Sequence, residues 1–89
     1  MTKEEAVEKA RNDLAQRLNT DAAHIAEESV EDADFPDTSL GAAGDDEMSG
    51  MMISSGWRIR LSAEGQSYEY RADKNQLRLF NYKGKNYRI

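Results

Sequence analysis

The sequence predicts an α+β fold in which an N-terminal helix packs on an antiparallel β-meander of three to five strands. Two observations carry this prediction. Residues 3–19 repeat apolar side chains at helical spacing, and residues 57–80 alternate apolar and polar side chains in three runs separated by two compact turns. An alternation with a period of two is typical of strands that bury one face. The chain has 89 residues, and we expect residues 1–89 to form a single domain.

The first segment, residues 3–19, has the signals of a capped helix. Thr2 stands three residues before Glu5, which is the spacing of a capping box. One apolar stripe recurs at helical spacing and consists of Val7, Ala10, Leu14 and Leu18. Because this stripe is narrow, the helix needs a second layer to cover it, and the apolar face of the meander is the obvious partner.

The register of the meander, residues 57–89, follows from its turns. A two-residue turn at 64–65 pairs Leu61 with Tyr68 and Ile59 with Tyr70. A second turn at 74–75 pairs Ala72 with Leu77 and Tyr70 with Leu79. Both turns place the apolar residues on one common face, as a half-buried sheet requires. Residues 83–85 indicate a further turn, which leads into a short terminal strand at 86–89.

The segment between the helix and the long loop is ambiguous. We interpret residues 26–34 as an irregular edge strand, because Pro36 follows and the residue before a proline prefers an extended backbone. Acidic side chains suit an edge strand that must not recruit neighbours, and this segment carries Glu27, Glu28, Glu31, Asp32 and Asp34. A second helix over the same residues is the alternative.

Residues 36–56 are predicted to form a long loop, rich in glycine and other small residues. Loops beyond ~12–15 residues without internal structure are uncommon in compact domains, and they are usually functional or disordered. We expect Met51, Met52 and Ile53 to start a strand or to lie beneath the loop. Together with Met48, these methionines alternatively form an adaptable binding patch, although such residues more often fill gaps in a core.

The composition excludes several kinds of chemistry. The chain has no cysteine, so a disulfide, a thiol nucleophile and a thiolate metal site are excluded, and a single histidine, His24, argues against the usual metal sites and catalytic triads. No apolar run reaches the ~20 residues that span a bilayer. The N-terminus lacks the apolar region of a secretory signal. We therefore expect a cytoplasmic domain without a cofactor, a metal ion, a membrane contact or an enzymatic activity.

Charge is distributed unevenly along the chain. Residues 1–50 carry 14 acidic and 4 basic side chains, whereas residues 51–89 carry 3 acidic and 8 basic ones. This asymmetry indicates either an interaction surface or an acidic helix and loop that lie near a basic sheet, and we favour the second explanation. The acidic run at 45–47 lacks the spacing of a calcium loop, so we expect it to form a solvated loop tip.

A row of arginines is the main candidate site. The predicted register places Arg58, Arg71 and Arg78 side by side on adjacent strands, on the sheet face away from the helix. Arginine suits bidentate contacts with anions, so this row can bind a phosphate, a carboxylate or an acidic peptide. The alternative, which we favour, is a solvated outer face on which Glu69 is shared diagonally and the acidic loop folds across the row.

Aromatic residues alternate with these arginines, as they do in sheets that bind single-stranded nucleic acid. The register turns Tyr68 and Tyr70 towards the helix, however, and leaves only Phe80 and Tyr82 on the arginine face. We predict a non-catalytic binding or regulatory module that meets a protein or peptide, as a monomer or a weak dimer. The residues expected to make this contact are Arg58, Arg71, Arg78 and Phe80. Weak binding of single-stranded nucleic acid by the same face is the alternative.

The order of several short motifs resembles that of a small, widespread bacterial domain family of uncharacterised function. The motifs are PDTSLG at 36–41, GMM at 50–52, and GWRIRL followed by YEYRAD within 56–73. Members of the family carry a PD-S-LG segment, a glycine–methionine segment and a G-YEYH-D hairpin. The resemblance covers roughly residues 14–80, and none of its motifs is catalytic.

The chain departs from the family pattern at three positions. Relatives often carry cysteine just after the LG and at the end of the last strand, where this chain has Ala42 and Phe80. If the relatives bridge that pair, the resemblance implies a lost bridge and a more mobile loop. The histidine that often follows YEY is Arg71 here. A helix followed by a three-stranded sheet is also similar to PepSY-type domains, which are linked to peptidase regulation.

Overall fold

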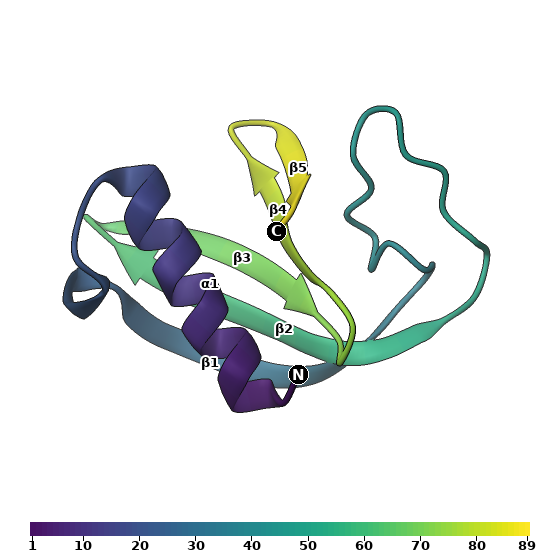
Figure 1. Ribbon diagram of the computed structural model, residues 1–89, viewed down its shortest axis with the longest axis horizontal. Helices are drawn as coiled ribbons and strands as arrows, with labels where there is room; N and C mark the ends of the chain where they lie inside the picture. The colour runs from purple at the N-terminus through teal and green to yellow at the C-terminus, as the bar shows by residue number, and fades with distance from the viewer.

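A computed structural model describes all residues from Met1 to Ile89 and contains one α-helix, one short 3-10 helix and a five-stranded antiparallel sheet (Figure 1). The helices are α1, Lys3–Leu18, and η1, Ala22–His24. The strands are β1, Ala26–Phe35; β2, Ser54–Ala63; β3, Gln66–Ala72; β4, Leu77–Tyr82; and β5, Lys85–Arg88. They are neighbours in the sheet in their sequence order. The predicted α+β fold is confirmed.

Helix α1 begins and ends with capping interactions. At its start, the Thr2 hydroxyl accepts a hydrogen bond from the Glu5 N–H at 3.2 Å, and the Glu5 carboxylate accepts one from the Thr2 N–H at 2.7 Å. This is the capping box that the sequence indicates. At its end, Asn19 adopts a left-handed backbone with a φ of 54°, a conformation that asparagine tolerates well. The helix therefore stops at Leu18, one residue before the predicted end.

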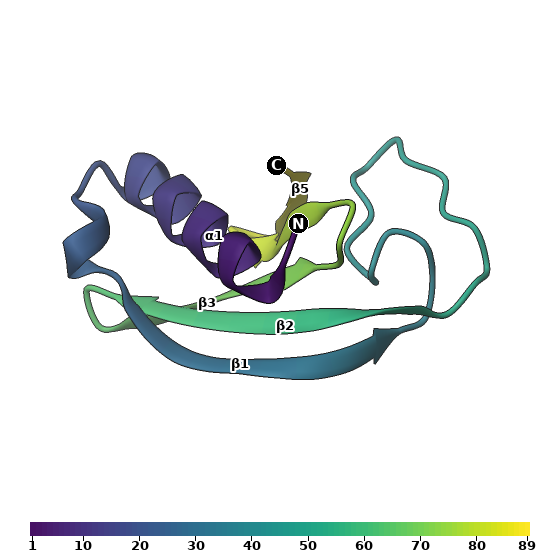
Figure 2. The ribbon, with the colours of Figure 1, turned by 60° about the horizontal axis from the view of Figure 1, so that its bottom comes forward.

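The main core lies between α1 and one face of the sheet. Figure 2 shows α1 lying across that face, above β2 and β3. The helix contributes mainly small residues, including Ala6 and Ala10, which are fully buried and let the helix lie close to the strands. The sheet contributes the larger side chains, and those fully buried are Ile59, Leu61, Tyr70 and Leu79.

The predicted register of the meander is confirmed at each of its four apolar pairs. These pairs are Leu61–Tyr68 and Ile59–Tyr70 between β2 and β3, and Ala72–Leu77 and Tyr70–Leu79 between β3 and β4. Glu64 and Gly65 both have positive φ angles, 53° and 79°, as the two central residues of a type I′ hairpin turn require. The last strand starts at Lys85, so the turn before it is tighter than the sequence suggests.

Residues 26–35 form strand β1, so the predicted edge strand is present and the alternative of a second helix is wrong. It pairs with β2 over its whole length, from Ala26 to Phe35, with one irregularity between Glu27 and Ser29. It forms one edge of the sheet, and most of its side chains are exposed. It ends at Phe35, one residue later than predicted, because Phe35 is still paired with Ser54.

Tyr82 lies on the opposite side of the sheet from the one predicted. Asn81 adopts a left-handed backbone with a φ of 53°, and the pairing between β4 and β5 shifts between Leu79 and Tyr82. This β-bulge breaks the simple alternation of side chains. The Tyr82 ring consequently lies on the helix side, with its centroid 6.0 Å from that of Tyr68 and 5.6 Å from the Arg17 guanidinium. The prediction that Tyr82 reaches the arginine face is wrong.

The long loop forms a third layer on the other face of the sheet. It runs from Pro36 to Ile53, because β2 begins at Ser54, three residues before the predicted start of the meander. Strands β4 and β5 rise between α1 and this loop in Figure 2. Leu40 and Ala42 of the loop are fully buried, and Phe35 just before it is 1% exposed. The loop is thus packed against the sheet and has a small core of its own.

A buried hydroxyl ties the sheet to the helix. The Tyr70 hydroxyl donates a 2.7 Å hydrogen bond to the Asp13 carboxylate, which also accepts a 2.8 Å hydrogen bond from the Arg17 Nε. Burial raises the pKa of Tyr70, and the bond to Asp13 raises it further. The charge-assisted bond compensates for burying a polar group in the core.

The Tyr70→Phe variant tests this bond. It is expected to lose about 1–3 kcal/mol of unfolding free energy, because it removes one partner of a charge-assisted hydrogen bond at a buried site. Urea denaturation measures the loss. Tyr68→Phe is the matched control, since the Tyr68 hydroxyl donates to the exposed Gln66 at 3.3 Å and its removal should cost less than about 0.5 kcal/mol. Equal losses in the two variants would contradict this account.

Candidate functional site

The three predicted arginines lie side by side, and we call them the arginine row. Arg58 of β2 is directly opposite Arg71 of β3, which is opposite Arg78 of β4. They project from the sheet face that α1 does not cover, as predicted. Their side chains are 30%, 14% and 2% exposed respectively, so the row passes from partly open to fully covered.

Arg78 is buried because the loop covers it. Its Nη1 and Nη2 atoms donate to the two carboxylate oxygens of Glu47 at 2.5 and 2.6 Å, a bidentate arrangement. Its Nε atom donates to the Gln76 side chain at 2.7 Å, and Nη1 also approaches the Ala42 carbonyl at 3.4 Å. The expectation that the row lies on a solvated face is therefore wrong at Arg78. The expectation that the acidic loop folds across the row describes this position.

The partner of Arg78 is held in its charged form. The Glu47 carboxylate accepts hydrogen bonds from Arg78 and from the Gly44 N–H at 3.0 Å, and these lower its pKa from 4.5 to about 2. Asp45 and Asp46 beside it are exposed, as expected of a solvated loop tip. The prediction of a solvated tip is wrong for Glu47, because this carboxylate turns inward to the guanidinium.

Arg71 makes a second attachment between the sheet and the loop. Its Nη1 atom donates to the Leu40 carbonyl at 3.0 Å, and its guanidinium lies 3.7 Å from the centroid of the Phe80 ring. A Cβ atom at Gly41 would lie 2.6 Å from the same Nη1, and Gly41 has a φ of 68°. Glycine is therefore required next to this contact. Phe80, a predicted site residue, stacks on Arg71.

Glu69 compensates for the like charges that face each other across the strands. Its carboxylate lies 2.8 Å from the Arg71 Nε, 3.4 Å from the Arg58 Nε and 3.6 Å from the Arg60 Nε. This is the diagonal sharing that the sequence analysis favours. It removes the repulsion expected between opposed arginines. Arg58 remains the most exposed member of the row.

The loop also closes on itself through its own hydrogen bonds. Thr38 and Gly50 form a two-way link, in which the Thr38 N–H donates to the Gly50 carbonyl at 3.0 Å and the Gly50 N–H donates to the Thr38 hydroxyl at 2.7 Å. The Ser39 and Ser49 hydroxyls are hydrogen-bonded to each other beside this link. The two ends of the loop are therefore joined to each other.

The largest exposed apolar side chains stand on this loop. We call residues 48–53 the methionine segment. The exposed fractions are 96% at Met48, 93% at Met51, 69% at Met52 and 74% at Ile53. The expectation that these residues lie under the loop or fill a core is wrong, because the bonds at Glu47 and Gly50 leave them on the outer side. The alternative of an adaptable patch stays a prediction. Sequence reasoning named the methionines and did not include Ile53 in that patch.

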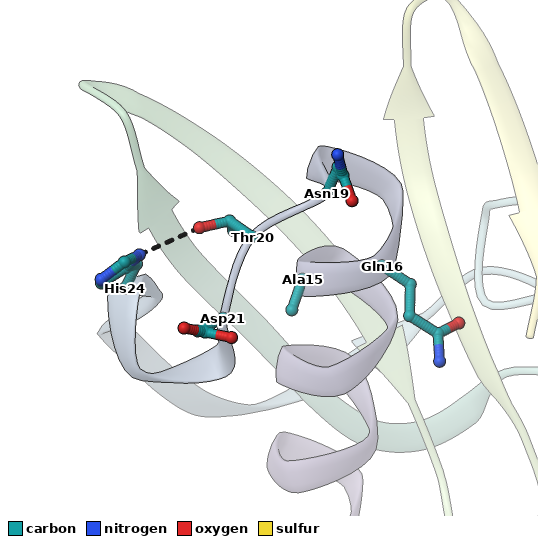
Figure 3. Close-up of a pocket in the computed structure, with 6 residues that line it drawn as sticks. All are labelled: Ala15, Gln16, Asn19, Thr20, Asp21 and His24. Atoms are coloured by element: carbon teal, nitrogen blue, oxygen red, sulfur yellow. Dashed lines mark hydrogen bonds between the residues drawn. The ribbon is translucent and has the colours of Figure 1, made fainter.

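The single histidine is among the residues that line an open surface pocket near the end of α1 (Figure 3). Its lining residues are Ala15, Gln16, Asn19, Thr20, Asp21 and His24. The His24 Nδ1 atom lies 3.0 Å from the Thr20 hydroxyl, and this is the one hydrogen bond drawn among the lining side chains. No carboxylate is hydrogen-bonded to the imidazole, so the pair lacks the third group that orients a catalytic base. This contact links the turn that follows α1 to the last residue of η1.

The chain contains no group of three or more His, Cys, Asp and Glu side chains that is arranged to hold a metal ion. No helix combines the length and apolar character needed to cross a membrane.

Comparison with known proteins decides the family. The family described as Domain of unknown function (DUF8738) matches residues 7–80. The chain belongs to this family. The DUF8738 match begins in α1 and ends in β4, so it includes the whole loop and the arginine row. This agrees with the expectation of a small domain of uncharacterised function, while the PepSY-type similarity and the cysteine pattern stay predictions. No curated protein and no solved structure matches the chain.

The Glu47→Gln variant tests the attachment of the loop in this DUF8738 domain. The amide keeps the shape of the carboxylate and removes its charge, which leaves a buried guanidinium without an anion. We expect a loss of about 1–3 kcal/mol of unfolding free energy and greater backbone mobility between Gly44 and Gly50, seen in ¹⁵N relaxation. Asp45→Asn is the control, because the Asp45–Lys85 pair is exposed and 3.9 Å apart. Unchanged loop mobility in Glu47→Gln would contradict the account.

Because of the same ion pair, we expect the free energy of unfolding to depend on pH in the acidic range. The folded pKa of Glu47, about 2, is below its ordinary value of 4.5, so the unfolded chain binds the proton more readily. The contribution of Glu47 is therefore complete above pH 4.5 and is lost as the pH falls towards 2. Urea denaturation of the wild type and Glu47→Gln should show a stability difference that shrinks through this window. A difference that stays constant down to pH 2 would refute the prediction.

Proposed function

We propose that the domain is a non-catalytic binding module that presents its methionine segment to an apolar groove on a partner protein. One observation carries the proposal: four large apolar side chains within six residues are 69–96% exposed. Exposed apolar side chains that are grouped in this way are typical of interaction sites. Methionine side chains are flexible and polarisable, so they adapt to the shape of the groove that receives them.

The attachment of the loop supports this proposal. A free loop loses conformational entropy when it binds, and that loss weakens the complex. Here the backbone on either side of Met48 is already held, by the Arg78–Glu47 pair on one side and by the Thr38–Gly50 link on the other. Met48 can therefore bind while its backbone stays in place, and the segment 51–53 starts from a fixed point at Gly50 and leads into β2.

Charge indicates the chemistry of the partner. Asp45 and Asp46 are exposed directly before the methionine segment, and residues 36–53 contain no lysine or arginine. The loop thus presents apolar side chains with negative charge at one end. A complementary groove is apolar with basic residues at its rim, and this complementarity favours fast and selective association.

The arginine row has a supporting role in this proposal. Arg71 donates its hydrogen bonds to Glu69 and the loop, and Arg78 donates to Gln76 and the loop, so both arginines help to position the methionine segment. Arg58 is the member that keeps some exposure for a direct contact. The nucleic-acid alternative needs a free row with Phe80 and Tyr82, and no specific observation favours it, since Arg78 is covered and Tyr82 lies on the helix side.

Selection of binding peptides tests the proposed function. A random peptide library displayed on phage is selected on the wild-type domain, and the winning peptides are titrated against a triple variant, Met48→Ser, Met51→Ser and Met52→Ser. We expect peptides that combine apolar and basic residues, and a loss of affinity of about tenfold or more in the triple variant, which corresponds to about 1.4 kcal/mol.

The matched control is Ile89→Ser, because Ile89 is the remaining large apolar residue that is exposed, at 46%, and it lies outside the segment. Its affinity for the selected peptides should be unchanged. Peptides that bind the triple variant as tightly as the wild type, or that lack basic and apolar residues, would overturn the proposal.

A further inference from the structure

The methionines of the chain divide into two environments. Met48, Met51 and Met52 are 96%, 93% and 69% exposed, whereas Met1 is partly buried and packs against the main core. The chain has no cysteine, so the thioethers of its four methionines are its only sulfur atoms, and thioethers are readily oxidised. Three of the four are grouped within five residues of one loop.

We propose that Met48, Met51 and Met52 form a methionine-oxidation site at which a hydroperoxide switches off binding through the methionine segment. The oxidation site stands on exposure and loop geometry alone, and the switch rests on the proposed function. Nothing else is needed for the reaction, because a thioether reacts with a peroxide directly.

The chemical step is a two-electron oxygen transfer. The thioether sulfur attacks one oxygen of hydrogen peroxide, and the S–O bond forms as the O–O bond breaks. The sulfur is oxidised to the sulfoxide. The departing hydroxide receives the proton of the transferred hydroxyl group and leaves as water, so the peroxide is the only reagent consumed. The product is polar and chiral where the methionine was apolar, and methionine sulfoxide reductases reverse the reaction.

The loop should survive this modification. No hydrogen bond that holds the loop uses a methionine side chain, and those next to the methionines join Glu47 to Arg78, Ser49 to Ser39, and Gly50 to Thr38. Oxidation of a buried methionine disrupts the core around it, whereas oxidation here changes only the surface that faces a partner. The fold and the binding surface are therefore affected separately.

The first experiment tests the oxidation site without any partner. The wild-type domain is treated with hydrogen peroxide, and peptide mapping by mass spectrometry follows the oxygen added to each methionine. We expect the three exposed methionines to react at rates close to that of N-acetyl-methionine amide and ahead of Met1, with circular dichroism and the unfolding midpoint unchanged. Slow oxidation at the loop, or unfolding that accompanies it, would overturn the site.

The second experiment tests the switch with the peptides selected on the wild-type domain. Oxidised wild type should bind them about tenfold more weakly, comparable to about 1.4 kcal/mol. The triple variant Met48→Leu, Met51→Leu and Met52→Leu keeps the apolar surface and cannot form sulfoxide at these positions. Its affinity for the selected peptides should therefore be the same before and after peroxide treatment.

The outcomes distinguish the two claims. If the serine variant keeps its affinity for the peptides, the proposed function fails, whatever oxidation does. If the serine variant loses affinity and oxidised wild type does not, the proposed function survives and the switch is overturned. A peroxide-induced loss in the leucine variant would place the sensitive group elsewhere and would also overturn the switch.

Discussion

The ion pair between Arg78 and Glu47 is the interaction on which the arrangement of the molecule depends. It joins the basic sheet to the acidic loop, and the Arg78 side chain is only 2% exposed. A buried guanidinium is costly unless an anion and further hydrogen bonds satisfy it, and Glu47, Gln76 and Ala42 provide them. The loop is consequently part of the folded domain, since releasing it would leave Arg78 beneath it without its anion.

The sheet is covered on its two faces by different kinds of interaction. On one face, α1 buries apolar side chains, and the Tyr70–Asp13 hydrogen bond links the two layers. On the other face, Arg71 and Arg78 hold the loop through its backbone carbonyls and one carboxylate. Polar contacts fasten the inner side of the loop, where Leu40 is also buried, and the large apolar side chains of the methionine segment stay on the outside. The arginine row holds the inner side of the loop, and the same attachment leaves the methionine segment exposed.

The sequence predicts the sheet well and the loop poorly, for physical reasons. The register is determined twice, by the period-two pattern and by the turn lengths, so Ile59 and Tyr70 could be paired without a structure. The sequence places Tyr82 on the wrong face because the bulge at Asn81 reverses the alternation of side chains along β4. An asparagine in a strand does not by itself indicate a bulge. Three adjacent acids give no indication that Glu47, rather than its neighbours, turns inward. Whether a loop methionine is buried depends on long-range contacts that its local sequence does not encode.

Native-state hydrogen exchange of the wild-type domain tests the central claim, that the loop is folded onto the arginine row. The amides of Gly41, Gly44, Glu47 and Gly50 donate hydrogen bonds within the loop. The account predicts that these amides are protected from exchange while those of Met51 and Met52 exchange rapidly. Exchange at Gly44 and Glu47 as fast as at Met51 would show that the loop is not held, and it would contradict the account.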